Sequence, residues 1–468
     1  MVFSTVLFLF IYLPVVLLVH YLSPVKWRNG VLLVFNLIFY GWGEPKYLLL
    51  MVFTIVVDYI DGLLVSYFKE KGNDKAAKIA VGAALVLNLA ILFFFKYWNL
   101  IAGTLSDVGL GFMPLMKDLR LPIGISFYTF QTMTYPVDVY RGDAKAQRNI
   151  VSFGTFVTLF PQLIAGPILK YKELADQVDS RTYKVEQFAS GVQVFMVGLG
   201  KKVLLANNLG MLWDAIKVIP AGELTTAGAW LGLLAFSLQI YFDFSGYSDM
   251  AVGLGRMLGF EFLRNFNYPY IAKSLTDFWR RWHISLGSWF REYVYIPMGG
   301  NRVSKPRMFF NLLVVWAATG IWHGASWNFL LWGLYFAALL ILEKGFLGKW
   351  IAKLPVFLQH FYALFFLAVS WAIFAVEDFG QMGSYLAAMF GFAGGGLSNP
   401  AMGYYFRSFL PVLLVSIFAA TPLATRLWNK VPQKAAQVIL PLLLLGGLTL
   451  CTAYLVDATY NPFLYFRF

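Results

Sequence analysis

Two histidines are the side chains best placed to do chemistry in this sequence. His323 lies within VVWAATGIWHGASWNFL, residues 314–330, with apolar helix-forming sequence on both sides. An ionisable group at bilayer depth is costly, so it is a functional candidate by default. His283 lies 40 residues earlier, in the stretch of the chain richest in polar and aromatic residues. A neutral imidazole in such a place can take a proton from a hydroxyl group, because its reference pKa is about 6.5.

The alternative for each histidine is a structural role as a hydrogen-bonded side chain. This alternative is weaker for His323, within a long apolar run, than for His283, which is expected at a membrane interface where water can reach it. Two histidines so far apart in the sequence do not form a persuasive metal-ligand set, and no metal is expected.

Other polar side chains interrupt apolar sequence. Asp243 and Asp249 belong to YFDFSGYSD, residues 241–249. Paired carboxylates can coordinate a cation or serve as acid and base, but helix capping or polar bracing explains them equally well. Gln162, in FPQLIAGP at 160–167, must find a partner or face a pocket.

The segment 265–302 combines aromatic and basic residues. Ser274 or Thr276 can cap a helix that starts near Asp277 and continues past His283, with its aromatic residues on shared faces. The arginines of this segment can bind the phosphates of an anionic cofactor or of lipid headgroups. Consecutive glycines before Asn301 let the backbone approach a ligand closely. The candidate cofactor-binding residues are Trp279, Arg280, Arg281, Trp282, Arg291 and Asn301.

The elements that carry these residues are expected to be transmembrane helices. Of the 468 residues, 59% are hydrophobic and only 13% are charged, whereas a soluble domain has about 25% charged residues. The net charge of +13 comes from basic clusters in short loops, which the positive-inside bias explains, so no nucleic-acid partner is expected. The single cysteine, Cys451, cannot form an intramolecular disulfide and is expected to be a buried apolar side chain.

We therefore expect an all-α polytopic membrane protein with about 11 to 13 crossings, because each crossing needs about 20 mostly apolar residues. Interfacial or re-entrant helices are expected where Gly and Pro interrupt the apolar runs. The chain is expected to form a single domain, 1–468. Within it, 1–240 holds N-terminal helices, 241–345 the catalytic core with both histidines, and 346–468 C-terminal helices.

Three segments together resemble the signature of the membrane-bound O-acyltransferases: DFWRRWHISL at 277–286, YIPMGGNR at 295–302 and WHGASWN at 322–328. More narrowly, they resemble the bacterial branch that O-acetylates alginate, cellulose or peptidoglycan. The similarity extends to residues 1–4 and 461–468 and covers nearly the whole chain. Met298 is the one departure, at a position where Leu is expected, and it conserves volume.

This resemblance implies a ring of tilted helices around a central tunnel, with His323 essential and His283 a second functional residue. It implies acetyl transfer from acetyl-CoA to a polysaccharide hydroxyl, directly or through an extracytoplasmic SGNH-type partner acetyltransferase, in the bacterial cytoplasmic membrane. Further tunnel or substrate residues are expected at Trp322, Ser326, Asn328, Gln162 and Asp243. The alternative function is a secondary transporter or flippase in which a buried histidine relays protons.

Overall fold

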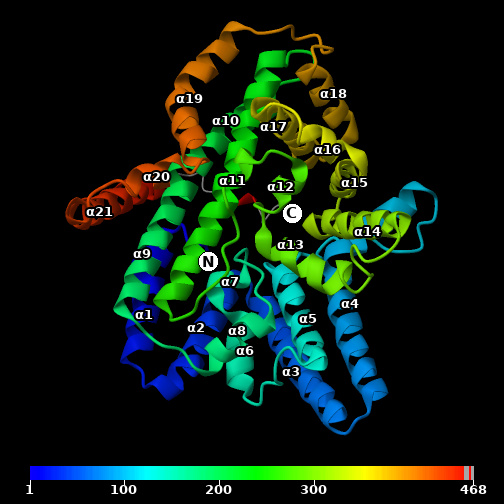
Figure 1. Cartoon of the computed structure of the whole chain (residues 1–468), viewed down its shortest axis with the longest axis vertical. Helices are drawn as coiled ribbons and strands as arrows, with labels where there is room; N and C mark the ends of the chain where they lie inside the picture. The colour runs from blue at the N-terminus through cyan, green and yellow to red at the C-terminus, as the bar shows by residue number, and fades with distance from the viewer. Residues whose placement is uncertain (458–462, 465–468) are drawn as a thin grey trace. The chain divides into compact units, whose positions relative to one another are not determined.

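The computed structural model describes residues 1–457 and 463–464, and all the regular secondary structure in this part is helical (Figure 1). The expected all-α membrane fold is therefore confirmed. Cys451 is buried, as expected. Of the C-terminal residues that carry part of the family resemblance, 461, 462 and 465–468 lie outside the described residues.

The helices pack as two compact units, each built from two stretches of chain. The first unit comprises residues 1–195 and 247–263, and the second comprises 196–246 and 264–468. The boundaries fall within two long helices, α9 (Val185–Gly200) and α11 (Thr226–Met257). These packing units do not test the expectation of a single domain, which stays a prediction.

The other helices of the first unit are η1 (Phe8–Tyr12), α1 (Leu13–Leu22), η2 (Val25–Trp27), α2 (Arg28–Gly43), η3 (Pro45–Tyr47), α3 (Leu48–Glu70), α4 (Asp74–Asp107), α5 (Ile125–Arg141), α6 (Ile150–Thr158), α7 (Phe160–Leu163) and α8 (Tyr171–Asp179). Those of the second unit are η4 (Lys201–Ala206), α10 (Asn207–Lys217), η5 (Pro269–Ile271), α12 (Leu275–Trp279), α13 (Ile284–Phe290), η6 (Arg291–Tyr295), α14 (Lys305–His323), α15 (Trp327–Leu342), η7 (Glu343–Leu347), α16 (Gly348–Ile351), α17 (Val356–Ala375), α18 (Phe379–Met389), α19 (Pro400–Ala419), α20 (Leu423–Trp428) and α21 (Gln433–Asp457).

Eight helices of the described chain are long and apolar enough to cross a membrane. Fewer helices qualify than the 11 to 13 crossings expected, because several apolar stretches of the sequence form shorter or more polar helices. For example, the apolar run near 150–166 is divided between α6 and α7 by an extended Leu159. The side chain of Asn36 accepts the N–H of Phe160 at 3.1 Å, so the break leaves no unsatisfied donor there.

In the second unit, α14 and α15 pack with their backbones almost in contact, side by side in Figure 1. A Cβ atom added to Gly320 would lie 2.4 Å from the carbonyl oxygen of Phe329, and one added to Gly333 would lie 2.3 Å from that of Trp316. Small residues at helix crossings are the usual means of such close packing in membranes. Because His323 is the last residue of α14, this contact fixes where its side chain lies.

We predict that Gly333→Ala destabilises the protein by about 1–3 kcal/mol, because a backbone oxygen cannot yield to the added methyl group. Gly446→Ala is the matched control: Gly446 lies inside α21 and has no atom within 4 Å of the added Cβ. Thermal unfolding in detergent should show a lower unfolding temperature for Gly333→Ala and an equal or higher one for Gly446→Ala. Equal unfolding temperatures for the two variants would contradict the close contact.

Candidate active site

His323 is enclosed by aromatic rings at the end of α14, and only 5% of its surface is exposed. Its ring centroid lies 5.0 Å from that of Trp332 and 5.5 Å from that of Phe374, both nearly edge-on. The chain turns away directly after it, at Gly324, where a Cβ atom would lie 2.2 Å from the ring of Phe329. The histidine is thus held in one place by helix packing.

The position of His323 at the C-terminus of α14 favours the gain of a proton by its imidazole. The carbonyl groups at a helix C-terminus carry partial negative charge, which stabilises a cation there by about 0.3–1 kcal/mol, and by up to about 2 kcal/mol in partly buried geometries. An imidazolium formed when His323 accepts a proton therefore meets a favourable field.

His283 lies at a sharp break in the chain between α12 and α13. Its φ of 46° is in the left-handed region, which only one other described non-glycine residue, Tyr268, adopts. Ser274 caps α12, as expected, but the expected single helix running from Asp277 past His283 is wrong. The helix ends because the left-handed residue redirects the chain, and such strained residues concentrate at functional sites.

Asn265 stabilises this break and fixes the tautomer of His283. Its side-chain oxygen accepts the backbone N–H of Ser285 at 3.1 Å and the Ser285 hydroxyl at 3.0 Å. The same oxygen lies 3.3 Å from Nδ1 of His283. Since an N–H group can bond only to the oxygen of the amide, Nδ1 of a neutral His283 must be the donor and Nε2 carries the lone pair. Nε2 is buried and has no hydrogen-bond partner among the described residues.

Trp322 connects the two histidines. Its ring centroid lies 5.2 Å from that of His323 and 5.9 Å from that of His283. Phe244 packs edge-on against His283 from α11, at 4.7 Å. Burial among these rings, and second the charge of His323 nearby, lower the pKa of His283 well below its usual value. The structure therefore brings together the two histidines and Trp322, three of the residues expected from the sequence.

Two of the expected cofactor-binding residues lie in a basic cluster at the surface, formed by Arg280, Lys344, Tyr295 and Asn301. Asn301 accepts hydrogen bonds from Tyr295 at 2.6 Å and from Lys344 at 3.3 Å. Arg280 is close enough to Lys344 for their charges to interact. Two like charges held together in this way favour a bound anion.

Trp279 links this basic cluster with the histidine site. It directly precedes Arg280, and its ring lies 5.6 Å from that of Trp332, which in turn contacts His323. By contrast, Trp282 is buried and packs on Trp371 at 5.2 Å.

The two remaining arginines of the segment lie in other surroundings. Arg281 forms an ion pair with Asp277 at 2.9 Å. Arg291 is exposed at the start of η6.

The remaining expected site residues have local structural partners. Asn328 donates hydrogen bonds to the carbonyl groups of Ile373 and Phe374 at 3.2 and 3.1 Å, which holds Phe374 beside His323. Ser326 precedes α15 as its N-cap residue. Gln162 belongs to the first unit, where its side chain donates to the carbonyl of Phe156 at 2.8 Å.

Asp243 is deeply buried in an ion pair. Its Oδ1 lies 2.6 Å from Nζ of Lys202, and its Oδ2 accepts the backbone N–H of Leu464 at 2.8 Å. Asp243 and Asp249 both lie inside α11 and not at its ends. The interpretation of these carboxylates as helix caps is therefore wrong, whereas polar bracing describes Asp243.

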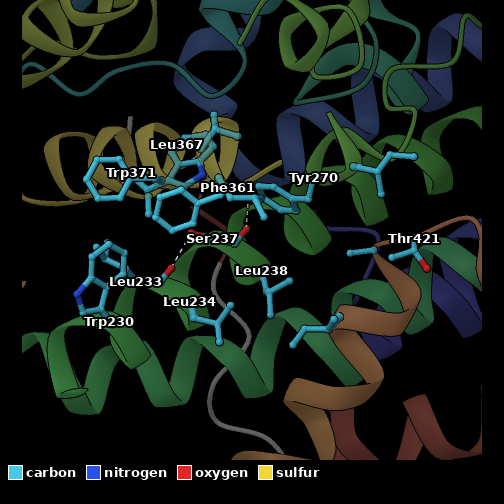
Figure 2. A pocket seen from close by; sticks show the side chains of 16 residues that line it. Trp230, Leu233, Leu234, Ser237, Leu238, Tyr270, Phe361, Leu367, Trp371 and Thr421 are labelled. Carbon is cyan, nitrogen blue, oxygen red and sulfur yellow. Dashed lines mark hydrogen bonds between the residues drawn. The ribbon is translucent and has the colours of Figure 1, made fainter. Parts of the chain in front are cut away.

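A cavity of about 440 Å³ in the second unit is lined mainly by residues of α11 and α17, and neither His323 nor the rings that contact it are among its lining residues. Figure 2 shows Trp230 and Leu234 from α11, with Phe361 and Trp371 from α17. The lining is almost entirely apolar. The hydroxyl of Tyr270 donates to the carbonyl of Ser237 and does not offer its proton to the cavity.

Trp371 forms the wall nearest the histidines, because its ring also contacts Trp332 and Phe374. Both of those residues contact His323. The cavity is thus separated from the rings around His323 by Trp371.

Several residues of this site were not expected from the sequence, namely Asn265, Trp332, Phe374 and Lys344. Asn265 lies in the loop between α11 and η5, 18 residues before His283. No helix or strand periodicity predicts that residues at this separation are in contact. Its place in the polar and aromatic segment was the only available signal.

The chain is similar in sequence to known acyltransferases. Residues 73–377 match the model of the membrane-bound O-acyltransferase family. The chain is 42% identical over 402 residues to the probable alginate O-acetylase AlgI of Azotobacter vinelandii, covering 85% of this chain and 80% of that protein. It is 32% identical over 429 residues to the peptidoglycan O-acetyltransferase of Helicobacter pylori, covering 84% and 80%. It is 29% identical over 243 residues to the teichoic acid D-alanyltransferase of Bacillus subtilis, covering 49% and 60%.

We predict that the protein loses stability as the pH falls through about 6.5, partly because of His283. An unfolded histidine binds a proton below about pH 6.5, whereas folded His283 has a lowered pKa and stays neutral, so the unfolded state binds more protons. Thermal unfolding between about pH 5 and 8 should show a weaker pH dependence for His283→Asn, a substitution that the left-handed backbone tolerates. His360→Asn controls for the loss of an imidazole elsewhere. A pH dependence unchanged by His283→Asn would contradict the lowered pKa.

Proposed function

The chain belongs to the membrane-bound O-acyltransferase family, and we propose that it moves an acetyl group from acetyl-CoA to a hydroxyl group of an exported polysaccharide. The observation that carries this proposal is the pair of buried histidines joined through Trp322. A thioester is reactive enough for this transfer without nucleotide hydrolysis, so the chemistry requires only proton transfer and positioning.

We propose that His323 is the general base. It takes the proton of the acceptor hydroxyl as the oxygen attacks the acetyl carbonyl carbon, and the field at the C-terminus of α14 stabilises the resulting imidazolium. The C–S bond of the thioester then breaks, and the imidazolium returns its proton to the leaving thiolate. The acetyl group ends on the acceptor oxygen, and the free thiol of CoA is released.

His283 serves a different role in this scheme because it remains neutral. With Nδ1 held by Asn265, its Nε2 presents a lone pair toward a buried space. A lone pair there can accept a hydrogen bond from the attacking hydroxyl or from a donor amide, which orients the reactants. His283 is therefore a positioning group, and its tautomer is fixed by Asn265.

A basic cluster and an apolar cavity, each joined to the rings around His323 through one tryptophan, support a donor and an acceptor that meet there. The basic cluster around Arg280 and Lys344 suits the phosphates of CoA. The apolar cavity is bounded by Trp371 (Figure 2), and the ring of Trp371 contacts Trp332 and Phe374, which both contact His323. These two features favour a path through the protein, of the kind that the expected central tunnel provides.

The names of the relatives, which specify alginate and peptidoglycan O-acetylation, support the proposed acceptor class. We propose an exported polysaccharide of this kind as the final acceptor, reached directly or through an extracytoplasmic SGNH-type acetyltransferase. We place the protein in the bacterial cytoplasmic membrane, where acetyl-CoA is available on one side and the polymer on the other.

His323→Ala should lower the rate of acetyl transfer by about 10²–10⁴-fold, the usual contribution of a general base. The measurement is transfer or hydrolysis of radiolabelled acetyl-CoA by purified protein, together with polymer acetylation in cells. His360→Ala is the matched control, since His360 lies on α17 and its Nδ1 is hydrogen-bonded to the carbonyl oxygen of Ala272 at 3.1 Å.

The alternatives give other outcomes. If His323→Ala still supports polymer acetylation and wild-type protein shows no turnover of acetyl-CoA, the acyltransferase mechanism fails. A proton-coupled transporter is then the better description of the chain.

Removing the basic cluster should weaken donor binding more than catalysis. The double variant Arg280→Ala/Lys344→Ala should raise KM for acetyl-CoA by about tenfold or more with little change in kcat, because each charged hydrogen bond contributes about 1.5–3 kcal/mol. Lys353→Ala, outside this cluster, should leave KM unchanged. An unchanged KM in the double variant would place the CoA phosphates elsewhere.

A further inference from the structure

A second group of buried ionisable residues lies in the first unit, apart from the histidines. Helices α3, α4 and α5 pack against one another there, and α3 and α4 lie side by side in Figure 1. Asp58 and Asp61 lie one turn apart on α3, on the face that these helices cover, with only 1% and 8% of their surfaces exposed. Both α3 and α4 are long and apolar enough to cross a membrane. Two carboxyl groups are thus enclosed near the middle of a membrane-spanning bundle.

Asp58 has a partner for one oxygen only. Its Oδ1 accepts a hydrogen bond from the side-chain amide of Asn88 on α4 at 2.8 Å. The hydroxyl of Thr132 on α5 donates to the oxygen of the same amide at 3.3 Å, which fixes the amide orientation. Oδ2 of Asp58 is buried and has no hydrogen-bond partner within the described chain, and the same is true of Oδ2 of Asp61.

Tyr128 adds an independent indication that something is bound between these groups. Its side chain is 1% exposed, and its hydroxyl lacks a hydrogen-bond partner among residues 1–457 and 463–464. That hydroxyl is close enough to Asp58 to interact with its charge. A phenol hydroxyl and a carboxyl oxygen, both buried and both without a hydrogen-bond partner among the described residues, leave donor and acceptor capacity unused beside Asp58.

An ionised pair in this place would be very unfavourable. Neither carboxylate has a cation within ion-pair distance in the described part of the chain. Lys96 on α4 is a buried basic side chain of this bundle, and it donates to the hydroxyl of Ser126 at 3.2 Å. It lies eight residues, or about 12 Å of helix, beyond Asn88. Two unpaired carboxylates one turn apart would each lose their hydration and would repel one another, at a cost of several kcal/mol. Binding a proton removes most of that cost.

We propose that Asp58 and Asp61 form an intramembrane proton-binding site, at which the folded protein holds at least one proton at neutral pH. The bound proton turns one carboxyl group into a donor that can satisfy an oxygen of its neighbour or the hydroxyl of Tyr128. The ligand is the proton itself, and the site does not rest on the acetyl transfer proposed above.

The titratable groups that face this site are few. Tyr128 and Tyr135 on α5 interact with the charges of Asp58 and Asp61, respectively, and Tyr40 on α2 interacts with Tyr128. Lys96 on α4 lies about two turns beyond Asn88, and α6 contains no titratable side chain. Tyr135 accepts the backbone N–H of Gln147 at 3.1 Å, in the basic loop after α5. Gly62 makes room for the ring of Tyr135, since a Cβ atom there would lie 2.1 Å from it.

The proposal sets the sign of a pH effect. A solvated aspartate releases its proton near about pH 4, whereas the folded site keeps its proton above that pH. At this site the folded state then binds more protons than the unfolded state, so the contribution of the site to stability falls as the pH rises, opposite in sign to that of His283. An aspartate kept ionised by a cation would give the opposite sign.

Asp58→Asn tests this directly, because asparagine mimics a protonated carboxyl group and does not titrate. Thermal unfolding of the full-length protein in detergent should be measured from about pH 5 to about pH 8.5. We expect the unfolding temperatures of variant and wild type to be similar at the acid end and that of the variant to be higher at the alkaline end. Asp74→Asn, an exposed aspartate at the start of α4, is the control and should not show this gain.

An unfolding temperature of Asp58→Asn that lies below that of wild type most strongly at alkaline pH would overturn the proposal. A second measurement remains decisive if the variant does not fold. Infrared spectra of wild-type protein near pH 7 should contain a carbonyl band of a protonated carboxylic acid that shifts in D₂O, and Asp61→Asn should reduce or displace it. The absence of such a band in wild type would show that both carboxylates are ionised.

Discussion

The packing of α14 against α15 is the interaction on which the candidate active site depends. At Gly320 and Gly333 the helix backbones approach so closely that a methyl group has no room. This contact sets the end of α14, and with it His323, against Trp332 on the neighbouring helix. Asn328, one residue after the start of α15, fixes Phe374 on the other side. Backbone contact and one amide therefore position the rings that enclose the imidazole.

The two histidines are chemically distinguished by their positions in the chain. His323 ends a helix, where a positive charge is stabilised. His283 lies in a strained turn, held by Asn265 and buried against Phe244, where a positive charge is disfavoured. One imidazole is thus suited to gain a proton and the other to stay neutral. A pair of identical side chains can divide the tasks of proton transfer and orientation for this reason.

The sequence predicted the class of fold and both histidines because these depend on local properties. Apolar runs and ionisable residues within them are visible one segment at a time. The break at His283 was missed because a left-handed backbone at a non-glycine residue has no sequence signal. Lys344 was missed because it approaches Arg280 only through the packing of α15 against α12. Capping and polar bracing were both open for Asp243, and the sequence could not decide between them because its ion-pair partner, Lys202, is 41 positions away.

The central claim is that acetyl transfer takes place at His323. The most direct measurement is an electron cryomicroscopy structure of the protein with a non-hydrolysable acetyl-CoA analogue. The account predicts that the acyl carbonyl lies beside His323, with room for an acceptor oxygen within about 3 Å of the imidazole, and that the CoA phosphates contact Arg280 and Lys344. An analogue bound with its acyl group remote from His323 would contradict acetyl transfer at this residue. So would a complex in which Trp322 and Trp332 still separate the imidazole from the bound analogue.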